Sequence, residues 1–143
     1  MSVDHVLKAK GHSLHSIHPH QTLAEAADVL AKHRIGVAVV CEGSTVVGML
    51  SERDIVQAIS HQRAAALTRP VRQFMSSPVV TCGRKDRIKD IMEIMSNRRI
   101  RHLPVVEGDA VVGLISIGDV IKHRLAEKQM EAAVLRDYAL ALR

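Results

Sequence analysis

The stretch Val46-Val47-Gly48-Met49-Leu50-Ser51-Glu52-Arg53-Asp54 recurs later in the chain as Val111-Val112-Gly113-Leu114-Ile115-Ser116-Ile117-Gly118-Asp119. The offset between the two stretches is constant at 113 − 48 = 65 residues. Around them, 10 of the 22 positions in 34–55 are identical to 99–120 without a gap, so chance is excluded. Self-similarity at a fixed period indicates a duplicated structural unit, and we therefore expect two copies of one fold.

Each copy shows the pattern strand, helix, strand, strand, helix. The first strand is expected near 14–17 in copy one and near 79–82 in copy two, and the hairpin strands at 37–41 with 46–50 and at 103–106 with 111–115. The apolar face of the first helix repeats at i, i+3, i+4 and i+7: Leu23, Ala26, Ala27 and Leu30, then Ile88, Ile91, Met92 and Met95. The second helix is expected to begin near Asp54 or Asp119. These elements predict an α/β fold whose two copies bury a shared core.

Composition narrows the class of protein. Hydrophobic residues make up 47% of the 143 residues, yet no window resembles a membrane span and the first residues lack the features of a signal peptide. Cys41 and Cys82 are single and distant, which favours a reducing compartment, so we expect a cytoplasmic protein. The net charge of +5 admits anionic ligands. Nucleic acid is not the expected partner, because Phe74 and Tyr138 alone offer aromatic rings for stacking.

Each copy places a Ser and an Asp at the junction of a buried strand and a helix. A helix N-terminus attracts phosphate, and the carboxylate of Asp54 or Asp119 can accept hydrogen bonds from two vicinal ribose hydroxyls. Arg53 lies between Ser51 and Asp54 and can donate to a phosphate. The alternative is that Ser and Asp only cap the helix. Retention of both residues in both copies, while their neighbours differ, favours a pair of binding sites.

The sequence resembles the cystathionine β-synthase (CBS) domain pair, or Bateman module, over roughly residues 8–127, and is most similar to free-standing bacterial CBS-pair proteins. The segments that carry this resemblance are Arg34-Ile35-Gly36-Val37-Ala38-Val39-Val40, Val47-Gly48-Met49-Leu50-Ser51-Glu52-Arg53-Asp54-Ile55, Phe74-Met75, Arg99-Ile100-Arg101-His102-Leu103-Pro104-Val105-Val106 and Gly113-Leu114-Ile115-Ser116-Ile117-Gly118-Asp119-Val120.

The resemblance implies a domain organisation with 8–62 as repeat 1, 63–76 as linker, 77–127 as repeat 2 and 128–143 as a C-terminal helical extension. It implies two small sheets flanked by helices with pseudo-twofold symmetry. Adenosine ligands such as AMP, ATP, NAD(H) or S-adenosylmethionine would bind in clefts between the repeats. The implied function is a regulatory sensor, commonly a homodimer, that acts on an unidentified protein, has no catalytic residues and no catalytic cofactor, and is not an enzyme. The alternative is a dimerisation or adaptor module without a nucleotide.

The resemblance also implies roles for individual residues. Asp54 with Ser51, and Asp119 with Ser116, would hold the ribose, and Arg53, Arg101 and His102 would contact phosphate. The adenine slot would be lined by the segment that enters the second strand and by the end of the first strand. In copy one these residues are Ile35, Gly36, Val37, Ala38, Ser16, Ile17 and His18, and in copy two they are Ile100, Arg101, His102, Leu103, Thr81, Cys82 and Gly83.

Other features are given a structural interpretation. His12, His15, His18 and His20 are closely spaced, but no carboxylate or Cys lies beside them and alternation along a strand would separate them, so no metal site is expected. No nucleophile elbow or phosphate-binding glycine loop is present, which argues against a hydrolase or an NTPase. Cys82 is expected to be an inert buried thiol. Leu125, Ala133, Val134 and Leu142 predict a helix that docks either on its own chain or on a partner helix.

Overall fold

The computed structural model describes residues 1–11 and 14–142 of the chain. The described residues divide into two compact units, each of which carries one sequence copy. Residues 14–80 and 107–112 form the copy-one unit, and residues 1–11, 81–106 and 113–142 form the copy-two unit. The two sequence copies thus correspond to two separately packed units.

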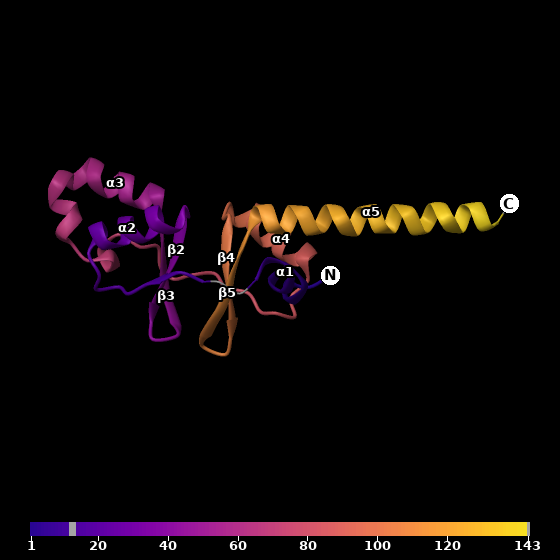
Figure 1. Cartoon of the computed structure of the whole chain (residues 1–143), viewed down its shortest axis with the longest axis horizontal. Coiled ribbons are helices and arrows are strands. Elements are labelled where there is room, and N and C mark those ends of the chain that lie inside the picture. The colour runs from indigo at the N-terminus through magenta and orange to yellow at the C-terminus, as the bar shows by residue number, and fades with distance from the viewer. Residues whose placement is uncertain (12–13, 143) are drawn as a thin grey trace. The chain divides into compact units, whose positions relative to one another are not determined.

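The copy-one unit follows the predicted order of elements. A parallel pair joins β1 (Ser16–Ile17) to β2 (Val37–Glu42). Strand β2 forms an antiparallel hairpin with β3 (Thr45–Ser51) (Figure 1). The helices are α2 (Leu23–His33) and α3 (Glu52–Gln62), followed by the short 3-10 helices η1 (Arg63–Thr68) and η2 (Val71–Gln73). The hairpin turn contains Gly43 at φ 61°, the positive angle that glycine adopts most readily.

The copy-two unit repeats this order and adds a helix. It contains α4 (Ile88–Arg98), β4 (His102–Glu107), β5 (Ala110–Ser116) and α5 (Ile117–Ala141) (Figure 1). The additional helix, α1 (Val3–Lys10), was not predicted from the sequence. It packs here because Val3, Val6 and Leu7 share one face and are fully buried.

The apolar faces predicted for the two first helices are confirmed. Leu23, Ala26 and Leu30 of α2 are buried. In α4 the buried residues are Ile88, Ile91 and Met95. Burial of such a stripe, rather than intrinsic propensity, supplies most of the stability of an 11-residue helix.

The α/β class is confirmed, but the strands form one mixed sheet in the order β1-β2-β3-β5-β4 and not two small sheets. The link between β3 and β5 is the single pair Thr45–Ala110, beside which the N–H of Val111 donates to the carbonyl oxygen of Ser44 at 2.9 Å. These residues all lie in the copy-one unit. A one-pair link leaves no periodic trace in a sequence, which explains why it was not predicted.

The first strand of copy two is reduced to one bridge, Cys82 with Val105, where a strand over 79–82 was predicted. The N–H of Cys82 donates to the carbonyl oxygen of Pro104, and the N–H of Val106 donates to that of Cys82. Pro104 stands where copy one has Val39, which pairs with Ser16. Because proline has no N–H, it cannot donate the next bond of the ladder, and the strand ends.

The linker packs on copy one. Ala66 and Val71 are fully buried, and Met49 exchanges backbone hydrogen bonds with Ser76 at 2.9 and 3.1 Å. The linker can lie this close to β3 only because residue 48 is glycine. A Cβ on Gly48 would lie 2.5 Å from Met75 Sδ and 3.1 Å from the carbonyl oxygen of Ser76. The linker is therefore part of the copy-one core.

Helix α5 runs without interruption for 25 residues. Within the copy-two unit its second half is uncovered, since Val134 is 66% and Leu140 56% exposed. Both alternatives for this segment, docking on its own chain or on a partner helix, stay predictions.

Candidate functional site

The two strand-to-helix corners have the geometry that the sequence indicates. In copy one, Ser51 ends β3 and caps α3, which begins at Glu52 and not at Asp54. Asp54 Oδ2 accepts hydrogen bonds from the Ser51 N–H at 2.8 Å and from the Ser51 hydroxyl at 3.0 Å. The Ser51 hydroxyl in turn accepts the N–H of Asp54 at 3.2 Å. This reciprocal arrangement is a capping box.

Copy two repeats the capping box. Asp119 Oδ2 accepts the N–H of Ser116 at 2.9 Å, and the Ser116 hydroxyl accepts the N–H of Asp119 at 3.1 Å. Both aspartates are half-buried. The capping role weighed against binding is therefore present in both copies. It leaves a carboxylate fixed at each helix N-terminus. The N–H groups of the helix start favour anions, and the carboxylate can accept hydrogen bonds from hydroxyl groups.

The segments predicted to line the adenine slot reach these corners. In copy one the N–H of Glu52 donates to the carbonyl oxygen of Gly36 at 2.9 Å, and Val37 pairs with Ser51 across the hairpin. In copy two the N–H of Ile117 donates to the carbonyl oxygen of Arg101 at 2.8 Å. The strand entries at Ile35–Ala38 and Ile100–Leu103 thus lie against the start of the helix, with Val37, Ala38 and Leu103 buried.

The ends of the first strands do not reach the corner of their own copy. The parallel register sets Ser16 against Val39 and Ile17 against Val40, while Val37 pairs with Ser51. The chain at His18 is therefore roughly four residues, or about 13 Å, further along the sheet. In copy two, Cys82 pairs with Val105 in the same way, with Thr81 and Gly83 on either side. A role of these six residues in a ligand site stays a prediction.

Charged side chains differ between the corners. Copy one has Glu52, whose carboxylate lies 3.8–3.9 Å from where a Cβ on Gly36 would be, and the exposed Arg53. Copy two has Arg101, which is exposed, and His102, which is half-buried. Burial lowers the pKa of His102, Lys10 and Arg101 lower it further, and Asp119 acts to raise it.

Sequence reasoning missed one residue of the copy-two corner, Lys10. Its ammonium donates to Asp119 Oδ2 at 2.7 Å and to the carbonyl oxygen of Leu114 at 3.0 Å. Burial acts to raise the pKa of Asp119, but hydrogen bonds from Lys10 and Ser116 outweigh it and hold the pKa below its ordinary value of 3.8. The sequence does contain a sign of the helix that carries Lys10, because Ser2 is a capping residue and Val3, Val6 and Leu7 follow at helical spacing. That pattern predicts a helix, but it does not predict that Lys10 contacts Asp119.

A family model for the CBS domain matches the chain twice, over residues 11–61 and 71–126. The chain belongs to the CBS-domain family. This confirms the resemblance inferred from the repeated segments, and the two copies are hereafter called CBS repeats. Each match includes one of the two strand-to-helix corners.

Three similar proteins illustrate the relationship. The crystal structure of a CBS-domain containing protein from Agrobacterium tumefaciens is 39% identical, with a TM-score of 0.81 over 87% of this chain and 99% of that chain. A CBS domain protein from Pyrobaculum aerophilum, complexed with AMP, is 30% identical, with a TM-score of 0.74 over 83% of this chain and 89% of that chain. The CBS domain-containing protein YhcV of Bacillus subtilis is 29% identical over 83% of this chain and 84% of its own length.

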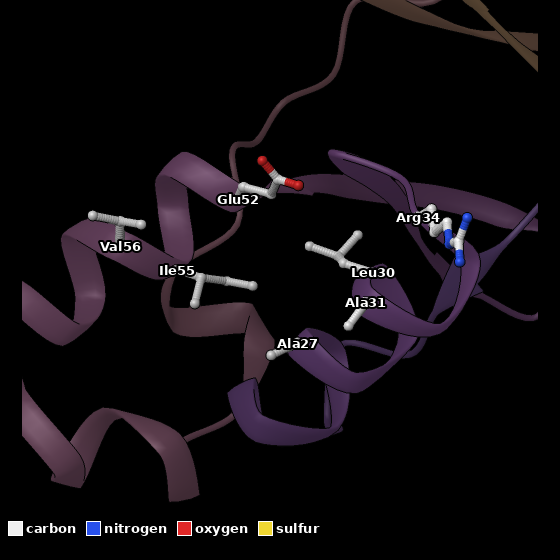
Figure 2. Close-up of a pocket in the computed structure, with 7 residues that line it drawn as sticks. All are labelled: Ala27, Leu30, Ala31, Arg34, Glu52, Ile55 and Val56. Carbon is white, nitrogen blue, oxygen red and sulfur yellow. The ribbon is translucent and has the colours of Figure 1, made fainter.

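The first CBS repeat also carries an apolar pocket of about 330 Å³ between α2 and α3 (Figure 2). Leu30 and Ile55 point into it, and the charged Arg34 and Glu52 stand at its edge (Figure 2). The remaining lining residues are Ala27, Ala31 and Val56. Glu52, the first residue of α3, lines this pocket and also belongs to the copy-one corner, so the pocket and the corner are adjacent.

The histidines near the first CBS repeat do not converge. His15 stacks on His33 with ring centroids 3.6 Å apart, and His18 lies 5.2 Å from His20. Within 1–11 and 14–142, His, Cys, Asp and Glu side chains form no group of three or more that could hold a metal ion. His12, also considered from the sequence, lies outside the described residues.

Among the helices of the described residues, none combines the length and the apolar character needed to cross a membrane.

Stabilisation by the Lys10–Asp119 pair should fade in acid. Because folding lowers the pKa of Asp119 below 3.8, its contribution is complete above that value and is lost as the pH falls through the lower pKa of the folded state. At pH 7 we expect Lys10→Met to lower the free energy of unfolding by at most about 1 kcal/mol, since both side chains are partly exposed.

Thermal unfolding followed by circular dichroism across a series of pH values checks this expectation. The difference between wild type and Lys10→Met should shrink as the pH falls below 3.8. Lys89→Met, on the exposed side of α4, is the control and should differ little from wild type at any pH. A Lys10→Met difference that stays constant with pH contradicts the ion-pair assignment.

Proposed function

We propose that this CBS-domain protein is a regulatory module that binds an adenosine nucleotide, AMP, ATP or NAD(H), at its strand-to-helix corners and is not an enzyme. The observation that carries the proposal is the duplicated corner, at which Ser51 with Asp54 and Ser116 with Asp119 adopt the same geometry. A carboxylate held at a helix N-terminus supplies an acceptor for ribose hydroxyls, and the helix N-terminus supplies donors for phosphate.

Two further observations support this proposal. The Pyrobaculum aerophilum relative, 30% identical, is a complex with AMP. The three relatives described above are matched over 84% or more of their own length, as expected for stand-alone regulatory modules. A nucleotide would regulate through its different affinity for two states of the module, which is the only way in which a ligand shifts such an equilibrium.

The second candidate function is an adaptor or dimerisation module without a nucleotide. It is favoured by the capping boxes, because the hydrogen bonds of the Asp54 carboxylate among the described residues all come from Ser51. A residue that only caps a helix contributes about 1 kcal/mol of stability and no binding. The two candidates therefore differ in their response to ligands.

We further propose that the protein acts as a cytoplasmic homodimer on a regulated protein. Val56 and Ile59 of α3, with Ile121 and Leu125 of α5, are apolar residues left exposed in the single chain. A second copy of the chain would bury them. The two buried, unpaired thiols, Cys41 and Cys82, fit a reducing compartment.

A thermal-shift screen with AMP, ADP, ATP, NAD(H) and S-adenosylmethionine tests the function. At 100 times its dissociation constant, a ligand specific for the folded state adds about 2.7 kcal/mol of stability. For a chain of this length that corresponds to an increase in Tm of roughly 5–10 °C. An unchanged Tm with every ligand would favour the adaptor function.

Replacement of the ribose acceptor gives a sharper result. Asp54→Ala should weaken binding of the nucleotide found in the screen by about 1–3 kcal/mol, or roughly 5- to 150-fold, because the hydroxyls lose a charged acceptor. The measurement is isothermal titration calorimetry. Asp90→Ala is the matched control, since Asp90 is also the third residue of a helix but pairs only with its neighbour Arg87 among the described residues. Equal affinity in Asp54→Ala and wild type would exclude Asp54 from the site.

A further inference from the structure

The two CBS repeats differ in what contacts the carboxylate of the corner. In repeat one, Asp54 Oδ2 accepts hydrogen bonds from the backbone and the neutral hydroxyl of Ser51. In repeat two, the second donor to Asp119 Oδ2 is the Lys10 ammonium, at 2.7 Å. A hydroxyl can rotate away to make room for a ligand at little cost. An ammonium can leave only if an ion pair is broken.

Lys10 is held at this corner by a docked helix. Leu7 of α1 is fully buried against Gly113, where a Cβ would lie 2.7 Å from Leu7 Cδ2. At the other end of α1, the N–H of Val3 donates to the carbonyl oxygen of Asp86 at 2.9 Å, and the N–H of Ile88 donates to that of Met1 at 3.1 Å. Because the backbone that carries Lys10 is fixed at several points, less conformational entropy opposes the contact with Asp119.

Repeat one places uncharged backbone at the equivalent position. Met49 corresponds to Leu114 by the 65-residue offset, and the carbonyl oxygen of Met49 accepts the N–H of Ser76 at 2.9 Å. Leu114 offers its carbonyl oxygen to the Lys10 ammonium instead. Met75 packs against Gly48 as Leu7 packs against Gly113. The supporting contacts are thus alike in the two repeats, but among the described residues only Asp119 of the two aspartates forms an ion pair, with Lys10.

From these contacts we infer that Lys10 closes the Asp119 corner to ribose, so that each chain takes one adenosine nucleotide, at the Ser51–Asp54 corner. This inference rests on the proposed function. A vicinal diol offers two neutral donors, which must replace a charge-assisted hydrogen bond at Asp119 but only the Ser51 hydroxyl at Asp54. Lys10 is in this sense the residue that makes the two aspartates unequal as acceptors for ribose.

Calorimetric titration of the full chain with AMP tests the inference by stoichiometry. Wild type should bind one AMP per chain, and Lys10→Met should bind two, because methionine keeps the length and apolar contacts of the lysine stem but not its charge. The double variant Lys10→Met with Asp119→Ala should return to one. Lys8→Met is the matched control, since Lys8 lies on the same helix and pairs with Asp4, and it should keep the wild-type stoichiometry.

Three results would overturn the inference while leaving the proposed function intact. They are two AMP per wild-type chain, one AMP per chain in both wild type and Lys10→Met, and a loss of affinity in Lys10→Met, which would make Lys10 a phosphate ligand. Failure of the proposed function looks different, because neither protein would then bind AMP, and the inference would fall with it. Far-ultraviolet circular dichroism of each variant verifies that the titrated protein is folded.

Discussion

Native protein mixed with Ellman's reagent at pH 8 should release chromophore from Cys82 about a thousandfold more slowly than an ordinary exposed cysteine. Burial, with a smaller contribution from the charge of Asp86, raises the pKa of Cys82 from 9.0 to about 12. The thiolate is the reactive species, and three pKa units remove all but about a thousandth of it. Burial also raises the pKa of Cys41, so both thiols should react slowly.

As long as the pH stays below the raised pKa of Cys82, the fraction of thiolate increases about tenfold for each unit of pH. The rate of reaction of Cys82 should increase by the same factor. Denaturant should make both thiols react at the speed of free cysteine, and Cys41→Ala isolates the Cys82 signal. Rapid reaction of one equivalent of thiol in native buffer would contradict the burial of Cys82. The slow reaction would assign Cys82 the role of an apolar residue in the sheet, as expected from the sequence, and not that of a redox switch.

The repeat made most of the fold predictable, because each local feature occurs twice. The helix faces at Leu23 and Ile88, the hairpins and the Ser–Asp corners all depend on residues close in sequence. Such features leave a period or a motif that can be read directly. The corner was found for the same reason, since Ser51 and Asp54 are only three residues apart.

The features that could not be predicted depend on distant residues. Lys10 reaches Asp119 across 109 positions, and no local pattern specifies such a contact. The single Thr45–Ala110 pair that unites the strands is of the same kind. Pro104 is an intermediate case, because its missing N–H is visible in the sequence. The effect of Pro104 on the strand at Cys82 depends, however, on which residues of the two segments pair, and the sequence does not show that register.

The second large effect concerns the helix that carries Lys10. Leu7→Ala should lower the free energy of unfolding by about 2–5 kcal/mol, because Leu7 is fully buried and alanine would leave a cavity. The cavity would face Gly113, which has no side chain to fill it. For a chain of this length the Tm should fall by roughly 5–15 °C, measured by circular dichroism or calorimetry.

Leu135→Ala is the matched control, since Leu135 is 68% exposed and its loss should change the Tm little. If Leu7→Ala and Leu135→Ala unfolded at the same temperature, α1 would not be docked as described. The two effects on repeat two are linked, because the contacts of Leu7 hold the backbone from which Lys10 reaches Asp119. Leu7→Ala should therefore also weaken the Lys10–Asp119 ion pair. Like Lys10→Met, it should raise the number of AMP molecules bound per chain above one. A destabilised protein that still binds one AMP per chain would show instead that Lys10 holds the corner without help from the helix.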